Sequence, residues 1–509
     1  MDEIKQPNTP YSYPLRKPPV TFSTGKGELA FGVWTIVFSL VLCNSLIFSG
    51  PSLGFGLAAL ALLGGTALYL HRRGHRFSRY SGGLLALCAV IAAGFLRSDD
   101  GGMKFLMILL LMAVPSLSFC VTAGQNRYSP AGVLSVLDAG RAAFGLGFGC
   151  LGEMGRGLRD AFQASGTLGK KTGAVALGLL IAVPVMAVMI PMLMFADAAF
   201  EGLMDLLPEF DLEEAMVTVI LGGFLGVVLY TRGVALHHNP RSAAPARQRR
   251  GMNPLTVNTV LIAVGLVYLV YLFSQLAYFV GGFSGILPEG YTLAMYARRG
   301  FFEMGWLCAM NLGLIALAVG LVRKDGRAPR LTRLLCLFIG LITVFLVAAA
   351  SAKMLLYIGS YGLTRLRVLT EVFMVWLGVT TVLVCVWLFR EKLPYMKVSL
   401  LLALVLCGGL FWADVDTQVA WYNVRAYQAG RMETVDVEYL GTLSAGAVPY
   451  IRELTEDPAM AQTAVHTLKN YYLYDPGDLR GWNWAQARAS EILEAYQPAE
   501  AAQAEEIND

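Results

Sequence analysis

Charge is scarce in this chain. Charged residues make up 15% of its 509 residues, whereas soluble domains contain about 25%. Apolar residues reach 56% and the mean hydropathy is +0.56, which excludes a solvated surface around one apolar core. The 40 Lys and Arg residues are spread over separate short segments, and this excludes the concentrated basic footprint of a nucleic-acid-binding protein. These shortages indicate an integral membrane protein.

Patterns for metal binding and disulfide formation are missing as well. All five histidines fall outside the apolar stretches, and the adjacent pair His237 and His238 stands in a basic loop. Structural zinc sites need four converging donors, so we predict no metal. Seven of the eight cysteines lie in apolar stretches and Cys150 lies in a loop, with no CxxC pair. We therefore expect no disulfide framework and no cofactor.

Catalytic motifs are absent too. The sequence contains no GxxxxGK[ST] loop that would cradle phosphates and no HExxH pair on a helix face. No histidine in an apolar stretch is placed to act as a base. The sequence therefore identifies no reaction, and we rank an enzyme last among the functional classes.

Long apolar stretches are what the chain does have. A helix needs about 17–25 apolar residues to cross a bilayer, and we predict about eleven spans, with ten or twelve as alternatives. Three stretches (82–96, 216–230 and 399–412) are short for a span. The fold class is all-α, a polytopic transmembrane helix bundle. The predicted spans are residues 29–48, 53–70, 82–96, 105–121, 174–195, 216–230, 255–282, 301–322, 334–358, 368–389 and 399–412.

Lys and Arg residues are concentrated in every second gap between these spans. The segment before the first span and every second gap after it together hold 27 Lys and Arg residues, and the intervening gaps hold 6. Cytoplasmic loops concentrate Lys and Arg. We therefore expect a multi-pass protein of the bacterial cytoplasmic membrane, with the N-terminus inside and the C-terminus outside.

Polar segments flank and interrupt the predicted bundle. One of them contains Ser129 and Pro130, a capping residue followed by proline at the first position of a helix. This segment predicts cytoplasmic helices lying in the headgroup layer, with a partner-binding helix as the alternative. The predicted division is a disordered cytoplasmic N-terminus at 1–28, the bundle at 29–412 with the interfacial helices at 125–173, a small helical extracytoplasmic domain at 413–497 and a disordered tail at 498–509.

Two glycines four residues apart, Gly222 and Gly226, stand in the sixth predicted span. Small residues at this spacing allow two membrane helices to approach closely. We interpret the pair as ordinary packing within the chain rather than as a dimer contact.

Ionisable residues within the later spans form the candidate site. Glu303, Lys353 and Glu371 are expected near one side of the membrane, and a charge in lipid normally faces a protein interior or a wet cavity. Arg299 precedes Glu303 by four residues and Arg367 precedes Glu371 by four, a spacing that predicts two local ion pairs.

The same residues define a hypothetical cavity. Asn311 lies two turns beyond Glu303, and Tyr357 continues the face of Lys353. We expect spans seven to ten to enclose an outward-facing polar cavity that the C-terminal domain covers. The alternative is a structural belt of ion pairs at the interface, where long basic side chains reach water. The candidate ligand-binding residues are Arg299, Glu303, Asn311, Lys353, Tyr357, Arg367 and Glu371.

Several sequence blocks in the second half of the chain carry a family resemblance. They are YARRGFFE at 296–303 with Asn311-Leu312, SAKMLLYIGSYGLTRLR at 351–367 with MVWL at 374–377, WYNVRAY at 421–427, the stretch 436–449, and Trp482-Asn-Trp484. Together they resemble an uncharacterised bacterial multi-pass membrane family, domain of unknown function 4173, which has a close neighbour labelled 4153. Lys353 stands where the family is expected to carry arginine. The resemblance extends over about residues 255–496 and implies a bacterial cytoplasmic-membrane protein, with no activity, cofactor or substrate.

Three functional classes follow. We favour a non-enzymatic transporter or lipid- and ligand-handling protein that uses the polar cavity. The alternative is a sensor or envelope assembly partner that acts through the C-terminal domain. The third class is a membrane-embedded enzyme with Glu303 or Glu371 as acid or base. The expected partners are the lipid bilayer and an envelope or small-molecule ligand, with no nucleic acid and no protein partner identified.

Overall fold

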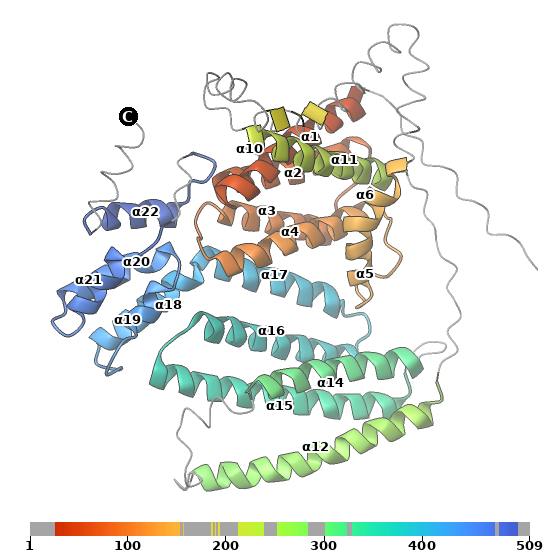
Figure 1. The fold of residues 1–509 in the computed structure, drawn as a ribbon. Helices are drawn as coiled ribbons and strands as arrows, with labels where there is room; N and C mark the ends of the chain where they lie inside the picture. Colours follow the sequence, from red (N-terminus) through yellow and green to blue (C-terminus); the bar gives the residue numbers. More distant parts are fainter. Residues whose placement is uncertain are drawn as a thin grey trace, which may run out of the picture.

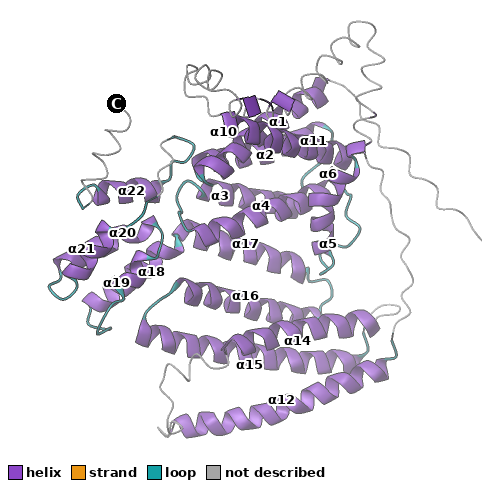
Figure 2. Ribbon diagram, in the orientation of Figure 1, coloured by secondary structure: helices purple, strands orange, loops and turns teal. Residues whose placement is uncertain are grey.

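The fold consists of helices throughout the described part of the chain (Figure 2). The computed structural model describes residues 26–152, 156, 185–186, 189, 192–193, 212–238, 252–283, 301–322, 328–473 and 478–496. Within these residues, nine helices are long and apolar enough to cross a membrane and no strand occurs. The prediction of an all-α polytopic bundle is therefore confirmed.

Ten predicted spans coincide with helices, and the remaining one, 174–195, lies almost wholly outside the described residues. The helix that corresponds to the short span 82–96 has only 16 residues. The bundle helices are α1 (Lys26–Asn44), α2 (Leu53–Arg72), α3 (Arg79–Gly94), α4 (Gly101–Thr122), α11 (Gly223–His238), α12 (Pro254–Phe283), α14 (Phe301–Val322), α15 (Arg330–Tyr361), α16 (Arg365–Trp387) and α17 (Tyr395–Ala413). Short π-helical segments, η1 (Ser45–Ser49) and η3 (Thr218–Gly222), extend α1 and join α10 (Leu212–Val217) to α11.

A first bundle contains α1 to α4, α11 and α17 (Figure 1). The two glycines of the sixth predicted span explain how closely α11 and its preceding turn approach α1. A Cβ atom at Gly226 would lie 2.7 Å from the Ile36 Cα, and one at Gly222 would lie 2.8 Å from the Leu40 Cα. Only hydrogen fits at these two positions, so the predicted close packing of Gly222 and Gly226 occurs within the chain.

A second bundle contains α12, α14, α15 and α16 (Figure 1). Its buried side chains form two clusters of their own, separate from the core of the first bundle. Helices α16 and α17 join the two bundles. There the hydroxyl groups of Thr380 and Ser399 lie 2.8 Å apart, and the Trp376 Nε1 donates to the Ser399 carbonyl at 3.1 Å.

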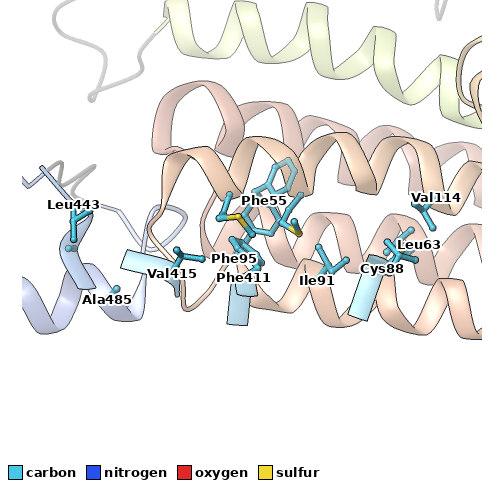
Figure 3. Close-up of a cluster of buried hydrophobic side chains, with 14 of the residues drawn as sticks. Phe55, Leu63, Cys88, Ile91, Phe95, Val114, Phe411, Val415, Leu443 and Ala485 are labelled. Carbon is cyan, nitrogen blue, oxygen red and sulfur yellow. The ribbon is translucent and has the colours of Figure 1, made fainter. Parts of the chain in front are cut away.

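The C-terminal domain, residues 414–496 and called the tail below, packs on one end of the first bundle. Its apolar residues continue the core of that bundle: Phe95 and Phe411 belong to the same buried cluster as Val415, Leu443 and Ala485 (Figure 3). The end of the molecule that carries the tail is called the tail side. The helices of the tail are α18 (Val415–Gln428), α19 (Val437–Gly441), η4 (Ala445–Ala447), α20 (Val448–Glu453), η5 (Leu454–Glu456), α21 (Ala461–Lys469) and α22 (Trp484–Leu493).

The segment predicted to hold interfacial helices is described up to residue 152. Its first α-helix, α5 (Ser135–Gly140), begins later than the predicted start at Ser129-Pro130, and η2 (Arg141–Gly145) and α6 (Leu146–Gly149) follow. The buried Asp138 carboxylate accepts the backbone N–H groups of Arg127 and Tyr128, each at 2.9 Å. These bonds fold the preceding residues back as turns, which delays the helix.

Candidate functional site

The candidate site lies where the tail meets the bundle, and it begins with a bend. Asp414 separates α17 from α18 and has a φ of 57°, a left-handed conformation that Asp tolerates better than most residues. Its carboxylate accepts a 2.7 Å hydrogen bond from the Thr417 hydroxyl in the first turn of α18. This bend carries Asp416 from the end of a membrane helix into the contact between the tail and the bundle, where the carboxylates of Asp414 and Asp416 are both buried.

A third carboxylate, that of Asp100, comes from the start of α4. Asp100 is the N-cap of that helix, and its Oδ1 accepts the backbone N–H groups of Gly102 at 2.9 Å and Met103 at 3.2 Å. Such caps satisfy the first amides of a helix. Asp100 has no solvent-exposed surface, and Ser98, two residues before it, directs its hydroxyl at the Asp414 carboxylate at 3.5 Å. The starts of α4 and α18 therefore face each other.

Arg365, the first residue of α16, connects these carboxylates. Its Nε donates to the Asp416 Oδ1 at 2.8 Å, and its Nη2 donates to the Asp416 Oδ2. The Asp100 Oδ2 lies 3.5 Å from the same Nε, within ion-pair range but without a hydrogen bond from any described residue. A guanidinium suits this role because its planar fork matches a carboxylate at two points. Arg365 thus ties the second bundle to the first bundle and to the tail.

A third polar contact completes the site. The Lys104 Nζ lies 3.0 Å from the Asp99 Oδ1 and 3.5 Å from the Ser52 Oγ. From the tail, the Gln486 Nε2 donates to the same Asp99 oxygen at 3.0 Å. Lys104 is almost completely buried although it stands in the first turn of an apolar helix. We call the following six residues the junction: Asp99, Asp100, Lys104, Arg365, Asp414 and Asp416.

Negative charge is in excess at the junction, which has four carboxylates and two cations. Burial raises the pKa of Asp414 to about 6; the Thr417 hydrogen bond opposes this shift, and the carboxylates of Asp416, Asp100 and Asp99 add to it. Burial, with a contribution from Asp416, also raises the pKa of Asp100, although Arg365 and the helix amides oppose the rise. A proton on this group is therefore favoured more than on an isolated aspartate.

A cavity of about 610 Å³ opens beside the junction. Three of the junction residues line it, Asp99, Lys104 and Arg365, and so do the apolar side chains of Phe105 and Ile108 on α4. The other wall belongs to the tail and to the turn before α2. That wall contains Ser49, Gly50, Pro51, Ser52, Thr442, Leu443, Ser444, Ala445, Tyr471, Tyr472, Leu473 and Gln486. The lining of the cavity therefore combines charged side chains with apolar side chains of a membrane helix.

Backbone bonds hold the tail against the bundle around this cavity. The Asn483 side-chain amide donates to the carbonyls of Phe95 at 3.1 Å and Ser98 at 2.9 Å. The Trp484 N–H donates to the Leu96 carbonyl at 2.9 Å, and the Leu53 N–H donates to the Trp482 carbonyl at 3.2 Å. The tail is thus fixed to the helix ends of the first bundle by hydrogen bonds to main-chain groups.

A different polar cluster lies at the opposite end of the first bundle. Glu28, within α1 and fully buried, pairs with Arg73 at 3.0 Å and with His238 at 3.1 Å. The rings of His75 and His237 approach each other at 3.2 Å. In the described part of the chain, no group of three or more His, Cys, Asp or Glu residues is arranged to hold a metal ion.

The residues predicted from the sequence lie elsewhere, in the second bundle. Asn311 is buried, and both ends of its amide have partners: its side chain accepts from the Tyr268 hydroxyl at 2.7 Å and donates to the Thr343 hydroxyl at 2.9 Å. Glu303 is exposed and Lys353 is half-buried. Arg299 lies outside the described residues. None of those described lines the cavity at the junction.

The structure does bring Arg367 and Tyr357 together, but not in the predicted way. The Arg367 guanidinium stacks 4.1 Å from the Tyr357 ring and donates to the carbonyls of Tyr361, at 3.0 Å, and Gly362. The predicted ion pair between Arg367 and Glu371 is wrong, because the Arg367 guanidinium instead donates to the carbonyls at the end of α15. The Glu371 Oε2 is buried without a hydrogen bond from the described residues.

Sequence reasoning missed the junction because its carboxylates stand just outside the spans. Asp99 and Asp100 directly precede α4, and Asp414 and Asp416 directly follow α17. A search for charges within apolar stretches passes over all four. The available signal is a pair of carboxylates at the boundary of a span on the side that is poor in Lys and Arg, together with Arg365, one of the few cations of that side.

Comparison with known proteins gives a family without a known activity. The family model described as "Domain of unknown function (DUF4153)" matches residues 80–454. The match covers most of the bundle and the first half of the tail, and it includes all six junction residues. The sequence resemblance named the family 4173 and gave 4153 as its close neighbour, and the model that matches is that of the neighbour. Neither a search of curated proteins nor a search of solved structures found a match.

Proposed function

This chain belongs to the DUF4153 family, and from that premise we propose that it is a non-enzymatic membrane protein that binds an amphipathic molecule, such as a membrane lipid, at the junction. That it is an integral membrane protein follows from the nine helices of the described residues that are long and apolar enough to cross a membrane. The observation that carries the proposal is the cavity shared by the tail and α4, because its lining contains both charged and apolar side chains.

The apolar part of the cavity lining suits an acyl chain. Phe105 and Ile108 lie on the first two turns of α4, and the Phe105 side chain remains 65% exposed. Because α4 has the length and hydropathy of a membrane span, this face is where lipid tails would contact the helix. A ligand entering from the membrane would meet these two side chains first.

The polar part of the lining suits a head group that both donates and accepts hydrogen bonds. An ammonium has three donors and a guanidinium has five. The Lys104 Nζ has two partners and the Arg365 Nη1 has none among the described residues, so both cations retain donors for a phosphate. The excess of carboxylates favours hydroxyl or ammonium groups in the rest of the head group. A phospholipid with an amine or polyol head group combines these features.

Tryptophans support a position of the cavity at headgroup depth. Trp412, Trp482 and Trp484 are partly exposed around the junction, and tryptophan is enriched at membrane–water interfaces. The Trp412 indole also donates to the Val90 carbonyl at 2.8 Å, and Arg97 lies over the Trp484 ring. These side chains mark the level at which lipid head groups would lie.

We place this side outside the cytoplasm of a bacterial cell, on the strength of the Lys and Arg distribution. The gaps on the tail side hold 6 of these residues and the opposite gaps hold 27. A reporter that is active only in the cytosol, fused after Trp412, should remain inactive. Activity of that fusion would reverse the orientation without removing the cavity.

Binding can be tested on the purified full chain in detergent. Dihexanoyl phosphatidylethanolamine should raise the midpoint of thermal unfolding as its concentration increases, because a ligand that binds only the folded state stabilises it. Dihexanoylglycerol, which lacks the phosphate and amine, should not. Substituting Phe105→Ala should weaken the response about tenfold, which corresponds to about 1.4 kcal/mol.

The matched control is Phe373→Ala. Phe373 is also exposed on a bundle helix, α16, but does not line the cavity, so this variant should respond as the parent chain does. Equal stabilisation by both lipids would reduce the effect to chain insertion and contradict a head-group site. Loss of the response in both variants would assign the effect to the general membrane surface.

A further inference from the structure

A second cavity, of about 380 Å³, adjoins the cavity beside the junction. Arg365, Thr442 and Leu443 line both cavities, so the two meet at these residues. The remaining lining residues of the second cavity are Thr364, Leu366, Leu369 and Tyr439. The first cavity therefore lies between the tail and α4, and the second lies between the tail and the start of α16.

The membrane helices α4 and α16 present similar surfaces to these cavities. Near its start, each carries a cation that is followed by two apolar residues three positions apart, on α4 Lys104, Phe105 and Ile108 and on α16 Arg365, Leu366 and Leu369. Residues three apart share one helix face. Leu366 is 58% exposed, and α16 has the length and hydropathy of a membrane span. The start of α16 therefore offers an acyl chain the kind of surface that α4 offers.

The hydroxyl groups that line the second cavity already have partners within the chain. The Tyr439 hydroxyl accepts from the Arg365 backbone N–H at 3.0 Å, and the Thr442 hydroxyl donates to the Tyr439 carbonyl at 2.7 Å. The Thr364 hydroxyl accepts from the Arg367 N–H at 3.4 Å. An apolar occupant would bury the two leucines favourably without leaving these hydroxyls unpaired. The second cavity therefore suits an acyl chain better than a head group.

An unpaired polar atom lies at the first cavity instead. The Ser444 Oγ is buried and has no hydrogen-bond partner among the described residues, and Ser444 lines the first cavity but not the second. Its backbone N–H donates to the Asp416 Oδ2 at 2.8 Å, the oxygen to which the Arg365 Nη2 also donates. Because an unpaired buried hydroxyl costs free energy, a polar group placed here is favoured. The head group is therefore expected in the first cavity.

A single lipid can reach both cavities. The Arg365 Nε lies 3.5 Å from the Asp100 Oδ2. Arg365 is the first residue of α16 and Asp100 is the N-cap of α4, so the starts of the two helices are separated by little more than one arginine side chain. The two acyl chains of a phospholipid branch from one glycerol next to the phosphate. A phosphate at Arg365 thus leaves one chain for each helix.

We propose that the site selects a phospholipid with two acyl chains. Its phosphate lies at Arg365 in the first cavity, one chain follows Phe105 on α4, and the second chain enters the second cavity along Leu366 on α16. This inference rests on the proposed function and adds a determinant of specificity: Leu366 contacts only the second chain, so it distinguishes lipids with two chains from lipids with one.

Thermal unfolding of the purified full chain in detergent tests this preference. Dihexanoyl phosphatidylethanolamine is compared with dodecanoyl lysophosphatidylethanolamine, which carries the same number of acyl carbons on a single chain. The two-chain lipid should reach half of its maximal stabilisation at an about tenfold lower concentration, because only it fills the second cavity with apolar surface. Leu366→Ala should raise that concentration about tenfold for the two-chain lipid and leave the one-chain response unchanged. Phe105→Ala should weaken the response to both lipids.

The matched control is Leu355→Ala. Leu355 is 59% exposed on α15 and lines neither cavity, so this variant should keep the preference of the parent chain. Equal responses of the parent chain to the two phospholipids would overturn the two-chain site and leave the proposed head-group site standing. A Leu366→Ala chain that keeps the preference, or that loses the response to both lipids equally, would also overturn it. Stabilisation by neither phospholipid would overturn the proposed function together with this inference.

Discussion

The two ends of the first bundle bury acidic side chains in opposite ways. At the end away from the tail, one carboxylate, Glu28, lies between two basic side chains, Arg73 and His238. At the tail side, four carboxylates share two cations, Lys104 and Arg365. Because removing a charge from water costs free energy unless it is paired, the first arrangement is a closed structural contact. The second leaves capacity for a proton or a ligand.

The same difference extends to the surroundings of each cluster. Glu28, Arg73 and His238 connect three helices of one bundle, α1, the end of α2 and α11. The junction connects two bundles and the tail, and it borders a cavity. A charge contact inside one packed body has little freedom to change, whereas a contact between bodies can open. Function is therefore expected at the junction, and the Glu28 cluster is expected to be a fixed structural contact.

The largest expected effect comes from removing the central cation of the junction. Arg365→Gln leaves the buried carboxylates of Asp100 and Asp416 without their shared partner, and breaking a buried pair costs about 3–5 kcal/mol. We expect about 3 kcal/mol, the lower end, because the Arg365 side chain is 36% exposed. The measurement is the thermal unfolding midpoint of the full chain in detergent at pH 7.

The matched change at the other end is Arg73→Gln. His238 still contacts the Glu28 carboxylate in this variant, so the expected loss is about 1 kcal/mol. An equal or larger loss for Arg73→Gln than for Arg365→Gln would contradict the distinction between a closed contact and a shared one.

The smallest expected effect concerns the residues predicted from the sequence. Glu303 is exposed and does not line the junction cavity, so Glu303→Ala should change stability by less than about 0.5 kcal/mol. Lipid stabilisation measured as above should also be unchanged in this variant. A strong loss of lipid response in Glu303→Ala would move the binding site to the second bundle and restore the original hypothesis.

The membrane helices were predictable because each is a local property of the chain. Twenty consecutive apolar residues lower the free energy of insertion wherever they occur, and ten predicted spans coincide with helices, with the largest boundary error at the span 216–230, whose helix continues to His238. The close packing of Gly222 and Gly226 was predictable for a similar reason, since small residues four apart form one helix face. Partners of buried polar groups were not: Asn311 bonds to Tyr268 and Thr343, which stand 43 and 32 residues away.

Sequence alone determined the class of this protein, its helix positions and its alternating basic loops. These features depend on how each segment interacts with lipid and water and require no contact with a distant residue. Tertiary structure alone decided which charges meet. Asp100, Arg365 and Asp416 are distant in the chain and lie at the ends of separate helices. Only the bend at Asp414 and the packing of the tail on the first bundle bring them together, since an ion pair depends on distance in space and not on separation in sequence.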